Sequence, residues 1–258
     1  MRNDFVLAEY TSRFQSARAS ALSEFGVGKG VGTLSEKLLH RVLKYTVEPR
    51  EEYHEVKHLG SVADIKNEQG ITEIQTGSLI KLLPKLKKLL PTEKVTVIIP
   101  VIREKSLAWL DPESGELSEK RRSPRRGRPS DALPELSSIS ELLGNENLLI
   151  RIVMLDADEY KLLDGYGADR KRRATKLNKI PTAIADVVDL RSPQELCELL
   201  PEGLCTTFTS SALSRALGLQ SRKTSFAKKL LLTHGIIERI GTEGRAHLYK
   251  IADFVNKT

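Results

Sequence analysis

The chain has 258 residues, which is enough for one large domain or two ordinary ones. Its hydrophobic share of 40% and its charged share of 29% are those of a soluble globular protein. No apolar run approaches the ~18 residues that a helical membrane span needs, so the composition predicts a chain that does not cross a bilayer.

The positive charge is unevenly distributed along the chain. The formal net charge is +7 and the isoelectric point is near 9.3. Basic residues cluster in three segments, 119–129 (EKRRSPRRGRP), 169–179 (DRKRRATKLNK) and 220–229 (QSRKTSFAKK). Such clusters predict a polyanionic partner, of which DNA is the first candidate. The alternative is that these side chains serve solubility on solvated faces.

Two features favour the cytoplasm as the location. The N-terminal residues MRNDFVLAEY lack the basic start, apolar middle and cleavage site of a secretory signal. Cys197 and Cys205 have neither the spacing of metal ligands nor a disulfide framework around them, as expected in a reducing compartment.

Two helices are predicted at the start of the chain. Residues 1–24 have a weak helical period, and the four glycines of 25–32 (FGVGKGVG) interrupt it as a hinge. The next helix covers 33–47, with Thr33 as its N-cap and Glu36 three residues later, which is the pattern of a capping box.

An α/β (α+β) architecture is predicted for the following segment. Strand-like runs occupy 52–59, 60–67, 70–77, 94–102 and 148–155, and helical patterns occupy 78–91 and 135–143. Pro84 lies early in the first of these helices, where it acts as a kink or a late start. A hairpin is expected with its turn at Pro112 to Gly115. Together these elements predict a mixed sheet flanked by helices.

The hairpin of residues 61–76 carries acidic side chains where packing alone favours Val or Thr. A symmetric loop from Asn67 to Gly70 puts Asp64 directly opposite Glu73, with Cβ atoms about 5 Å apart. Two carboxylates in this position repel each other unless a cation lies between them or solvent screens them. A divalent metal ion resolves the conflict, and an ordinary exposed acidic hairpin is the alternative.

The order of elements over roughly residues 33–155 resembles the PD-(D/E)xK nuclease superfamily, and the wider pattern is similar to an uncharacterised bacterial group assigned to it. In that superfamily an acid ends the second strand and an acid-x-Lys motif lies on the third. Asp64 and Glu73 match the two acids. Gln75 occupies the lysine position, where it would orient water or a phosphate oxygen through its amide. This residue departs from the pattern because glutamine carries no positive charge.

The resemblance implies a restriction-endonuclease-like sheet with a metal site. Asp64 and Glu73 would be ligands of Mg²⁺ or Mn²⁺, and Glu36 of the preceding helix would join them. Glu36 also fits the capping box, and the two roles do not exclude each other. Lys81 and Lys85, on the helix after the hairpin, are candidates to supply the catalytic lysine.

The segment from Ser192 onward resembles a winged helix-turn-helix, because three helical patterns are followed by two strands around Thr242 to Gly244. The resemblance implies that the third helix enters the major groove of DNA. The expected DNA contacts are Arg222, Lys223, Ser225 and Lys228 of that helix and Arg245 of the wing. Winged-helix modules also mediate protein contacts, which is the alternative.

The chain is thus predicted to consist of four parts: an N-terminal helix and hinge (1–32), the nuclease-like domain (33–165), a basic linker (166–191) and a C-terminal domain that folds alone (192–258). Within the nuclease-like domain, Arg126-Gly127-Arg128-Pro129 resembles the core of an AT-hook, which lays its arginines in a narrow minor groove. The alternative is a solvated basic loop.

Three functional hypotheses follow from these patterns. The first is a metal-dependent DNA endonuclease or nuclease-like protein that hydrolyses phosphodiester bonds and is targeted by a winged-helix domain. The second is a nuclease fold that has lost activity, consistent with Gln75, and acts as a DNA-binding regulator. The third is a protein-interaction adaptor with a basic surface. The expected partner is DNA, with no membrane contact, and a homodimer is left open.

Overall fold

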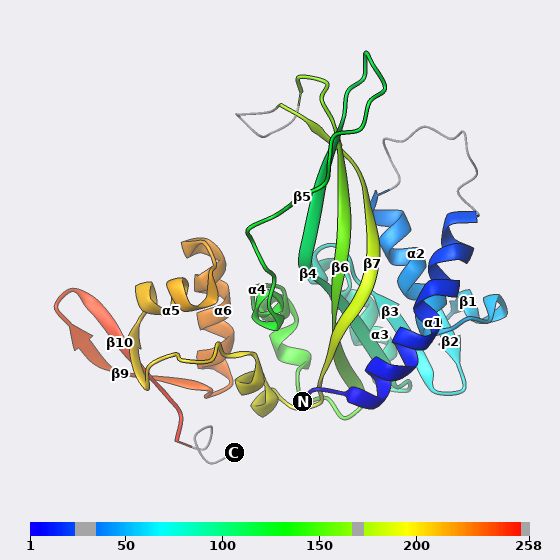
Figure 1. Ribbon diagram of the computed structural model, residues 1–258. Helices are drawn as coiled ribbons and strands as arrows, with labels where there is room; N and C mark the ends of the chain where they lie inside the picture. The colour runs from blue at the N-terminus through cyan, green and yellow to red at the C-terminus, as the bar shows by residue number, and fades with distance from the viewer. Residues whose placement is uncertain (24–34, 167–172, 254–258) are drawn as a thin grey trace.

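The computed structural model describes residues 1–23, 35–166 and 173–253. A mixed sheet forms its centre, with strand order β1-β2-β3-β4-β6-β7 and β5 paired to the outer part of β4. The strands are β1 (His54–His58), β2 (Ser61–Asn67), β3 (Gly70–Ile74), β4 (Val95–Leu110), β5 (Arg121–Arg122), β6 (Leu148–Leu162) and β7 (Thr175–Leu190). Strands β3, β4 and β6 are parallel, and the other neighbours are antiparallel. Helices flank the sheet (Figure 1), which confirms the predicted α+β architecture.

Helices α1 (Asp4–Ser23) and α2 (Ser35–Val47) cover one face of the sheet (Figure 1). The buried side chains of α1 recur every three or four residues, and they are Val6, Tyr10, Phe14, Ala17 and Ala21. Together with the buried face of α2, they pack against sheet residues that include Ile98 and Val153. The predicted hinge at 25–32 and the predicted N-cap Thr33 lie outside the described residues.

Short helical segments cover the opposite face. They are η2 (Leu79–Lys81), α3 (Leu83–Leu89), η3 (Pro129–Ala132), α4 (Leu133–Leu136) and η4 (Ser137–Leu142). Pro84 lies in the first turn of α3, where its missing N–H costs no helical hydrogen bond, so the predicted late start is confirmed. None of the helices in the described ranges is long and apolar enough to cross a membrane.

Strands β4, β6 and β7 extend beyond the helices as an arm (Figure 1), formed by residues 103–110, 156–162 and 175–180. The predicted turn at Pro112 to Gly115 lies at its tip, where Gly115 N donates to Asp111 O (2.9 Å). Ion pairs connect neighbouring segments of the arm, and they are Arg103–Asp156 (2.6 Å), Lys105–Glu159 (2.7 Å) and Lys120–Asp158 (2.6 Å). The arm therefore carries charges of both signs, whereas the base of the sheet is apolar.

The interpretation of residues 166–191 as a basic linker is wrong for residues 175–190. Thr175–Leu190 form β7, which pairs antiparallel with β6 as far as Leu162. The first half of β7 belongs to the solvated arm, and its side chains are therefore largely basic and polar. This composition is typical of a loop, although the backbone forms a strand. Pro181 lies opposite Ala157 next to a register shift on an edge strand, a position at which a sheet accepts proline.

Residues 193–253, the C-terminal unit, form a second sheet with two α-helices. Its elements are η5 (Pro193–Leu199), β8 (Thr207–Thr209), α5 (Ser210–Leu217), α6 (Ser221–Thr233), β9 (Ile237–Glu243) and β10 (Ala246–Ile251), with strand order β8-β10-β9. Thr209 caps α5 by accepting a hydrogen bond from Ala212 N (3.3 Å). Gly218 ends α5 with a φ of +65°, which favours glycine. The first predicted helix of this region is the 3₁₀ segment η5.

One hydrophobic core runs from the main sheet into the C-terminal unit. Leu136 of α4 and Ile139 of η4 are fully buried in the same cluster as Leu230 and Leu231 of α6. A fragment that begins at Ser192 would expose its side of this contact to water. The structure therefore favours cooperative folding of the two parts over the independent folding predicted from the sequence.

Glu48 directly follows α2, and its carboxylate fixes the chain at the point where the helix ends. The residue is 4% exposed and accepts hydrogen bonds from Arg50 Nε (2.8 Å), Arg50 N (3.1 Å) and Asn67 Nδ2 (2.8 Å). The hydrogen bond from the Arg50 side chain is the largest cause that lowers the pKa of Glu48 from 4.5 to about 2.

We expect Glu48→Gln to destabilise the protein in a pH-dependent way. Because the folded-state pKa lies below the ordinary value, the stabilisation is complete above pH 4.5 and is lost as the pH falls toward 2. The variant should lose ~1–3 kcal/mol of unfolding free energy near neutral pH, after allowance for solvent screening at the half-exposed Arg50. Urea denaturation at neutral pH, and at the lowest pH at which the parent stays folded, measures the effect. A deficit that does not shrink on acidification would contradict this account.

Candidate active site

The site begins where β2 and β3 separate. The predicted register is confirmed at three pairs, Ile65–Thr72, Lys66–Ile71 and Asn67–Gly70. The ladder ends there, one pair before Asp64 and Glu73. These two residues therefore do not form the cross-strand pair expected from the sequence, and they lie instead at a fork between the strands.

Asp64 occupies the gap between the separating strands. Its Oδ2 accepts a hydrogen bond from Ile74 N (2.7 Å), a backbone group of β3 that faces β2, and lies 3.1 Å from His40 Nε2 of α2. Burial raises the pKa of Asp64, but the hydrogen bonds with His40 and Ile74 and the charge of Lys85 outweigh it, so that the pKa lies below its ordinary value. Asp64 is thus held as a carboxylate at the fork, with a fifth of its side chain exposed.

Glu73 lies on β3 and is almost completely buried. Lys85 Nζ of α3 approaches its Oε1 to 2.5 Å and also donates to Val62 O (2.6 Å). The contact with Glu73 is an ion pair between the Lys85 ammonium and the buried carboxylate. Burial, followed by the negative charge of Asp64, raises the pKa of Glu73 to about 7 against the opposing effect of Lys85.

The two candidate lysines are separated by the break between η2 and α3. Lys85 lies on the inner side of α3, 19% exposed, beside the fork. Lys81 ends η2 with its side chain in solvent. Only Lys85 of this pair is brought to the carboxylates. Lys85 lies on the helix after the hairpin, where the sequence analysis placed the candidate lysines.

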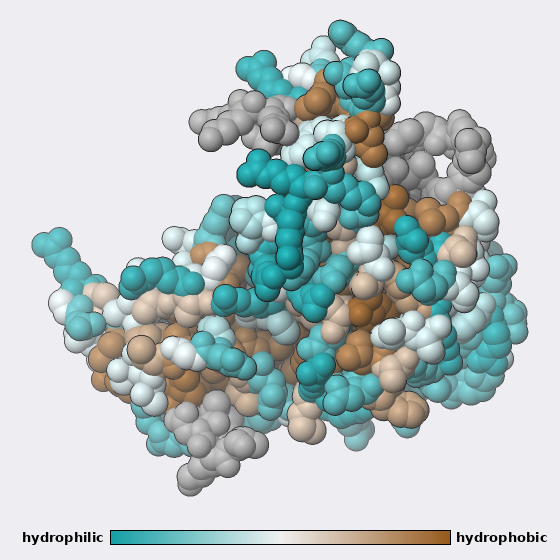
Figure 2. All heavy atoms as spheres, viewed as in Figure 1, coloured by the Kyte–Doolittle hydropathy of each residue, from teal (hydrophilic) through white to brown (hydrophobic). Residues whose placement is uncertain are grey.

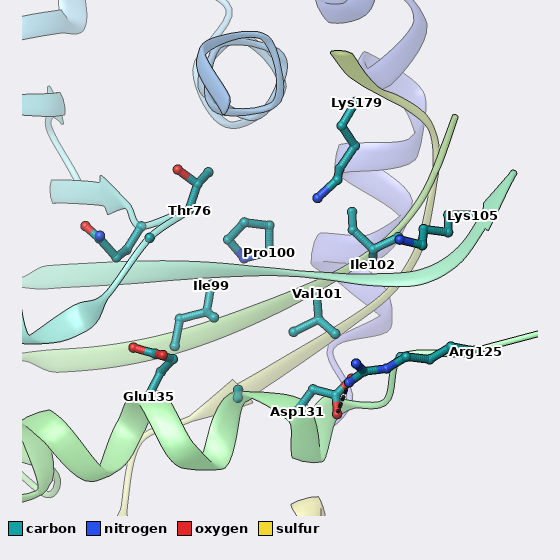
Figure 3. Close-up of a pocket in the computed structure, with 14 residues that line it drawn as sticks. Thr76, Ile99, Pro100, Val101, Ile102, Lys105, Arg125, Asp131, Glu135 and Lys179 are labelled. Carbon is teal, nitrogen blue, oxygen red and sulfur yellow. Dashed lines mark ion pairs between the residues drawn. The ribbon is translucent and has the colours of Figure 1, made fainter. Parts of the chain in front are cut away.

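Gln75 follows the end of β3 and is among the residues that line a cavity of about 460 Å³. Figure 3 shows this cavity with Lys105, Asp131 and Glu135 among its labelled residues. The backbone N of Gln75 donates to Ile98 O (2.9 Å), and its Nε2 donates to Ser78 O (3.2 Å). The cavity lies along the edge of β4 that β3 leaves uncovered. Charged side chains reach it from several elements, and they are Lys105, Arg125, Asp131, Glu135 and Lys179. Lys105, Glu135 and Lys179 are not among the site residues predicted from the sequence. Lys105 lies between a predicted strand and a predicted hairpin, Glu135 lies at a predicted helix start, and Lys179 lies in the predicted linker.

The expected third metal ligand cannot be placed, because the side chain of Glu36 lies outside what the structure describes. Within the described ranges, no group of three or more His, Cys, Asp or Glu side chains could hold a metal ion. Among the described side chains, Asp64 and Glu73 therefore have no third carboxylate beside them that could complete a metal site.

The predicted DNA contacts of the C-terminal unit have different surroundings. Arg222, Lys223 and Ser225 are exposed on α6, and Arg245 is exposed at the turn between β9 and β10. Lys228 is directed inward. Its Nζ donates to Ser210 Oγ (2.8 Å) and lies 5.1 Å from the centre of the Tyr249 ring. Lys228, which the sequence predicted as a DNA contact, is half-buried and packs α6 against α5 and β10.

The Arg126-Gly127-Arg128 segment is attached to the fold on both sides. Arg126 pairs with Glu104 (2.9 Å), and Arg128 donates to Ala216 O at the end of α5 (2.9 Å). Gly127 N donates to Arg103 O, and a Cβ at Gly127 would lie 2.1 Å from Ile102 O. The segment is thus not the free arm that an AT-hook is. Figure 2 shows hydrophilic residues gathered where this connection crosses from the sheet to the C-terminal unit.

Comparison with known proteins identifies the family but assigns no activity. Residues 37–191 match the family model described as "Domain of unknown function (DUF8091)". The chain belongs to this family. The matched DUF8091 region extends from α2 to the end of β7, so it contains the whole main sheet and the fork. A protein of Treponema pallidum (strain Nichols), named "Uncharacterized protein", is 30% identical over 222 residues, covering 85% of this chain and 87% of the relative. No solved structure matches.

Proposed function

We propose that this DUF8091 protein is a metal-dependent phosphodiester hydrolase that acts on DNA, with the C-terminal unit as its substrate-binding part. The observation that carries the proposal is the fork, where Asp64, Glu73 and Lys85 come together from β2, β3 and α3. Two carboxylates and a lysine at the separation of two strands are the set that the resemblance to the PD-(D/E)xK superfamily implies.

The side chains at the fork fit a divalent cation such as Mg²⁺ or Mn²⁺. Magnesium prefers oxygen ligands and is commonly bound by one or two carboxylates, with water and substrate phosphate in the other positions. Asp64 and Glu73 would hold it, since both present carboxylate oxygens at the fork. The negative charge of Asp64 contributes to the raised pKa of Glu73, and a bound cation would counteract that repulsion. When bound, such an ion supplies an acidified water and neutralises phosphate charge.

The other residues of the fork complete the proposed chemistry. Lys85 provides a fixed positive charge that would stabilise the negative charge of the phosphate as it is attacked. His40 and Ile74 N hold the Asp64 carboxylate in position from two sides. The Gln75 amide, fixed by its hydrogen bond to Ser78 O, would contact substrate from the adjoining cavity.

The C-terminal unit supports DNA as the partner. Its order of elements, two α-helices followed by a two-stranded hairpin, resembles a winged helix-turn-helix. Exposed Arg222 and Lys223 lie at the start of α6, where they would contact phosphates. We also propose the cytoplasm as its location, because Cys197 and Cys205 are both free thiols in the structure.

Metal titration tests the proposal before any specific substrate is known. Mg²⁺ or Mn²⁺ at ~100 times its dissociation constant should raise the melting temperature by ~5–10 °C, because a ligand that binds only the native state stabilises it. Asp64→Asn and Glu73→Gln should each remove this increment. A parent protein without any metal response, at concentrations that saturate ordinary magnesium sites, would overturn the metal site.

Cleavage of labelled DNA tests the reaction itself. Asp64→Asn and Glu73→Gln should lower the metal-dependent rate by at least ~100-fold, and Lys85→Met by ~100- to 1,000-fold. Lys81→Met is the matched control. Lys81 lies at the end of η2 with its side chain in solvent, so this variant should leave the rate unchanged. If the parent binds metal and DNA but cuts neither strand, the hydrolase proposal fails and the DNA-binding regulator replaces it.

A further inference from the structure

A groove separates α6 from the segments that cover the main sheet. Its volume is about 580 Å³. Helix α6 contributes Arg222, Lys223, Phe226 and Lys229, and the facing wall includes Ile80 of η2 and Glu135 of α4. Three cations against one carboxylate make the groove electropositive, which favours a negatively charged occupant.

Large apolar side chains lie exposed among these cations. Phe226 is 45% exposed on α6, and Ile80 is 51% exposed on the opposite wall. The cations alone would be enough to bind an acidic peptide. Bases of an unpaired nucleic-acid strand also need a flat apolar partner, and an exposed aromatic ring within a basic groove is the combination that proteins use to bind single strands.

The groove leads to the candidate active site. Glu135 lines both the groove and the cavity that contains Gln75. Ser78 lines the groove, and its carbonyl oxygen accepts the hydrogen bond from Gln75 Nε2. A strand in the groove would therefore extend from α6 toward Gln75, which follows the end of β3 two residues after Glu73.

The packing of α6 favours a single strand over a duplex at this place. Thr224, Ala227, Leu230 and Leu231 of α6 are buried, and the basic side chains Arg222, Lys223 and Lys229 line the groove. A volume of about 580 Å³ lies in the range of pockets that enclose one small ligand, ~300–1,000 Å³. Such a space accommodates a short part of one unpaired strand, whereas a duplex would require α6 to project freely into a groove ~12 Å wide.

We propose that the groove between α6 and η2–α4 binds a single-stranded segment of nucleic acid, with its phosphates on Arg222, Lys223 and Lys229 and a base stacked on Phe226. This inference rests on the proposed function, since it names the form of substrate that approaches the fork. It assigns the face of α6 to holding an unpaired strand, and it assigns no role in strand binding to Arg245 of the wing.

Fluorescence anisotropy in EDTA measures binding without cleavage. The full chain is titrated into a short labelled oligodeoxynucleotide of mixed sequence and, separately, into its duplex. The parent should bind the single strand more tightly. Phe226→Ala, or Phe226→Leu as the milder variant, should raise Kd for the strand by ~5- to 100-fold, the effect of losing one stacked base. Arg222→Ala should reduce the slope of log K against log salt by ~0.7.

The opposite wall provides the decisive variant. Ile80→Glu places a negative charge in the groove from η2 and should weaken strand binding at least tenfold. Leu117→Glu is the matched control, because Leu117 is 52% exposed near the tip of the arm, far along the chain from both walls, and should leave Kd unchanged. Arg245→Ala should also leave strand binding unchanged.

Three results would overturn the groove. The first is a Kd for the single strand in Ile80→Glu and Phe226→Leu equal to that of the parent. The second is tighter binding of the duplex than of the single strand, with duplex binding lost in Arg245→Ala. The third is competition by polyglutamate as strong as that by unlabelled single strand, which would indicate an acidic protein partner. Failure of the groove is distinguishable from failure of the proposed function. If the parent cleaves DNA with metal and the groove variants bind the strand normally, only the groove proposal is rejected. If strand binding depends on the groove but no cleavage occurs, only the hydrolase proposal is rejected.

Discussion

Replacing Asp189 with Ala should lower the free energy of unfolding by ~3–5 kcal/mol, because it leaves the guanidinium of Arg151 buried without its partner. Arg151 and Asp189 lie opposite each other on β6 and β7 and are 14% and 8% exposed. Two parallel hydrogen bonds of 2.7 and 2.8 Å join them. Asn3 Nδ2 also donates to Asp189 (2.8 Å), and Tyr10 OH accepts from Arg151 (3.1 Å). The pair therefore attaches the N-terminal helix to the sheet.

Urea denaturation followed by circular dichroism measures this loss. Glu141→Ala is the control, since its ion pair with Lys87 is more than half exposed at both ends and should contribute less than ~1 kcal/mol. Replacing the pair together, as Arg151→Met with Asp189→Leu, should recover much of the stability, because no charge is then left buried. A loss in Asp189→Ala as small as that in Glu141→Ala would show that the pair is not desolvated.

Leu136→Ala should destabilise the main sheet and the C-terminal unit together, by ~2–5 kcal/mol. Leu136 is fully buried between them, in the cluster that also contains Leu230 of α6. Removal of its side chain leaves a cavity shared by both parts. Because the core is continuous, we expect one cooperative transition in the parent and in the variant, shifted to lower denaturant concentration.

The single Trp109, which is 9% exposed on β4, reports on the main sheet, and circular dichroism reports on both parts. Coincident midpoints from the two probes would confirm the shared core. Ile240→Ala is the control, because Ile240 is 45% exposed on β9 and should change the midpoint little. Two separate transitions, of which Leu136→Ala shifts only one, would restore the interpretation of the C-terminal unit as a domain that folds alone.

Local patterns were sufficient for the elements whose signals lie within a few residues. The loop at Asn67 to Gly70 determined the register of β2 and β3, since hairpin pairing follows from loop length. Pro84 determined where α3 begins, and the apolar run from Val95 predicted a strand. Such features depend on backbone geometry and side-chain period, which a sequence contains directly.

Features that depend on distant segments were not readable in this way. β7 is a strand because β6 supplies its hydrogen-bond partners, and its solvated half has the composition of a loop. Lys228 matched the basic pattern of its helix as well as Arg222 did, yet Ser210 and Tyr249 turn it inward. A pattern along one helix does not say which side another element covers.

The candidate site shows the same division. The sequence by itself determined which acids share the hairpin, Asp64 and Glu73, because the period of a strand and the length of its turn place them. Only the tertiary structure decided that the strands separate there, that Ile74 N and His40 hold Asp64, and that Lys85 is the lysine beside Glu73 while Lys81 stays in solvent. The physical reason is range: turn geometry and strand period act between neighbours in the chain, whereas burial and charge pairing act between groups that folding brings together.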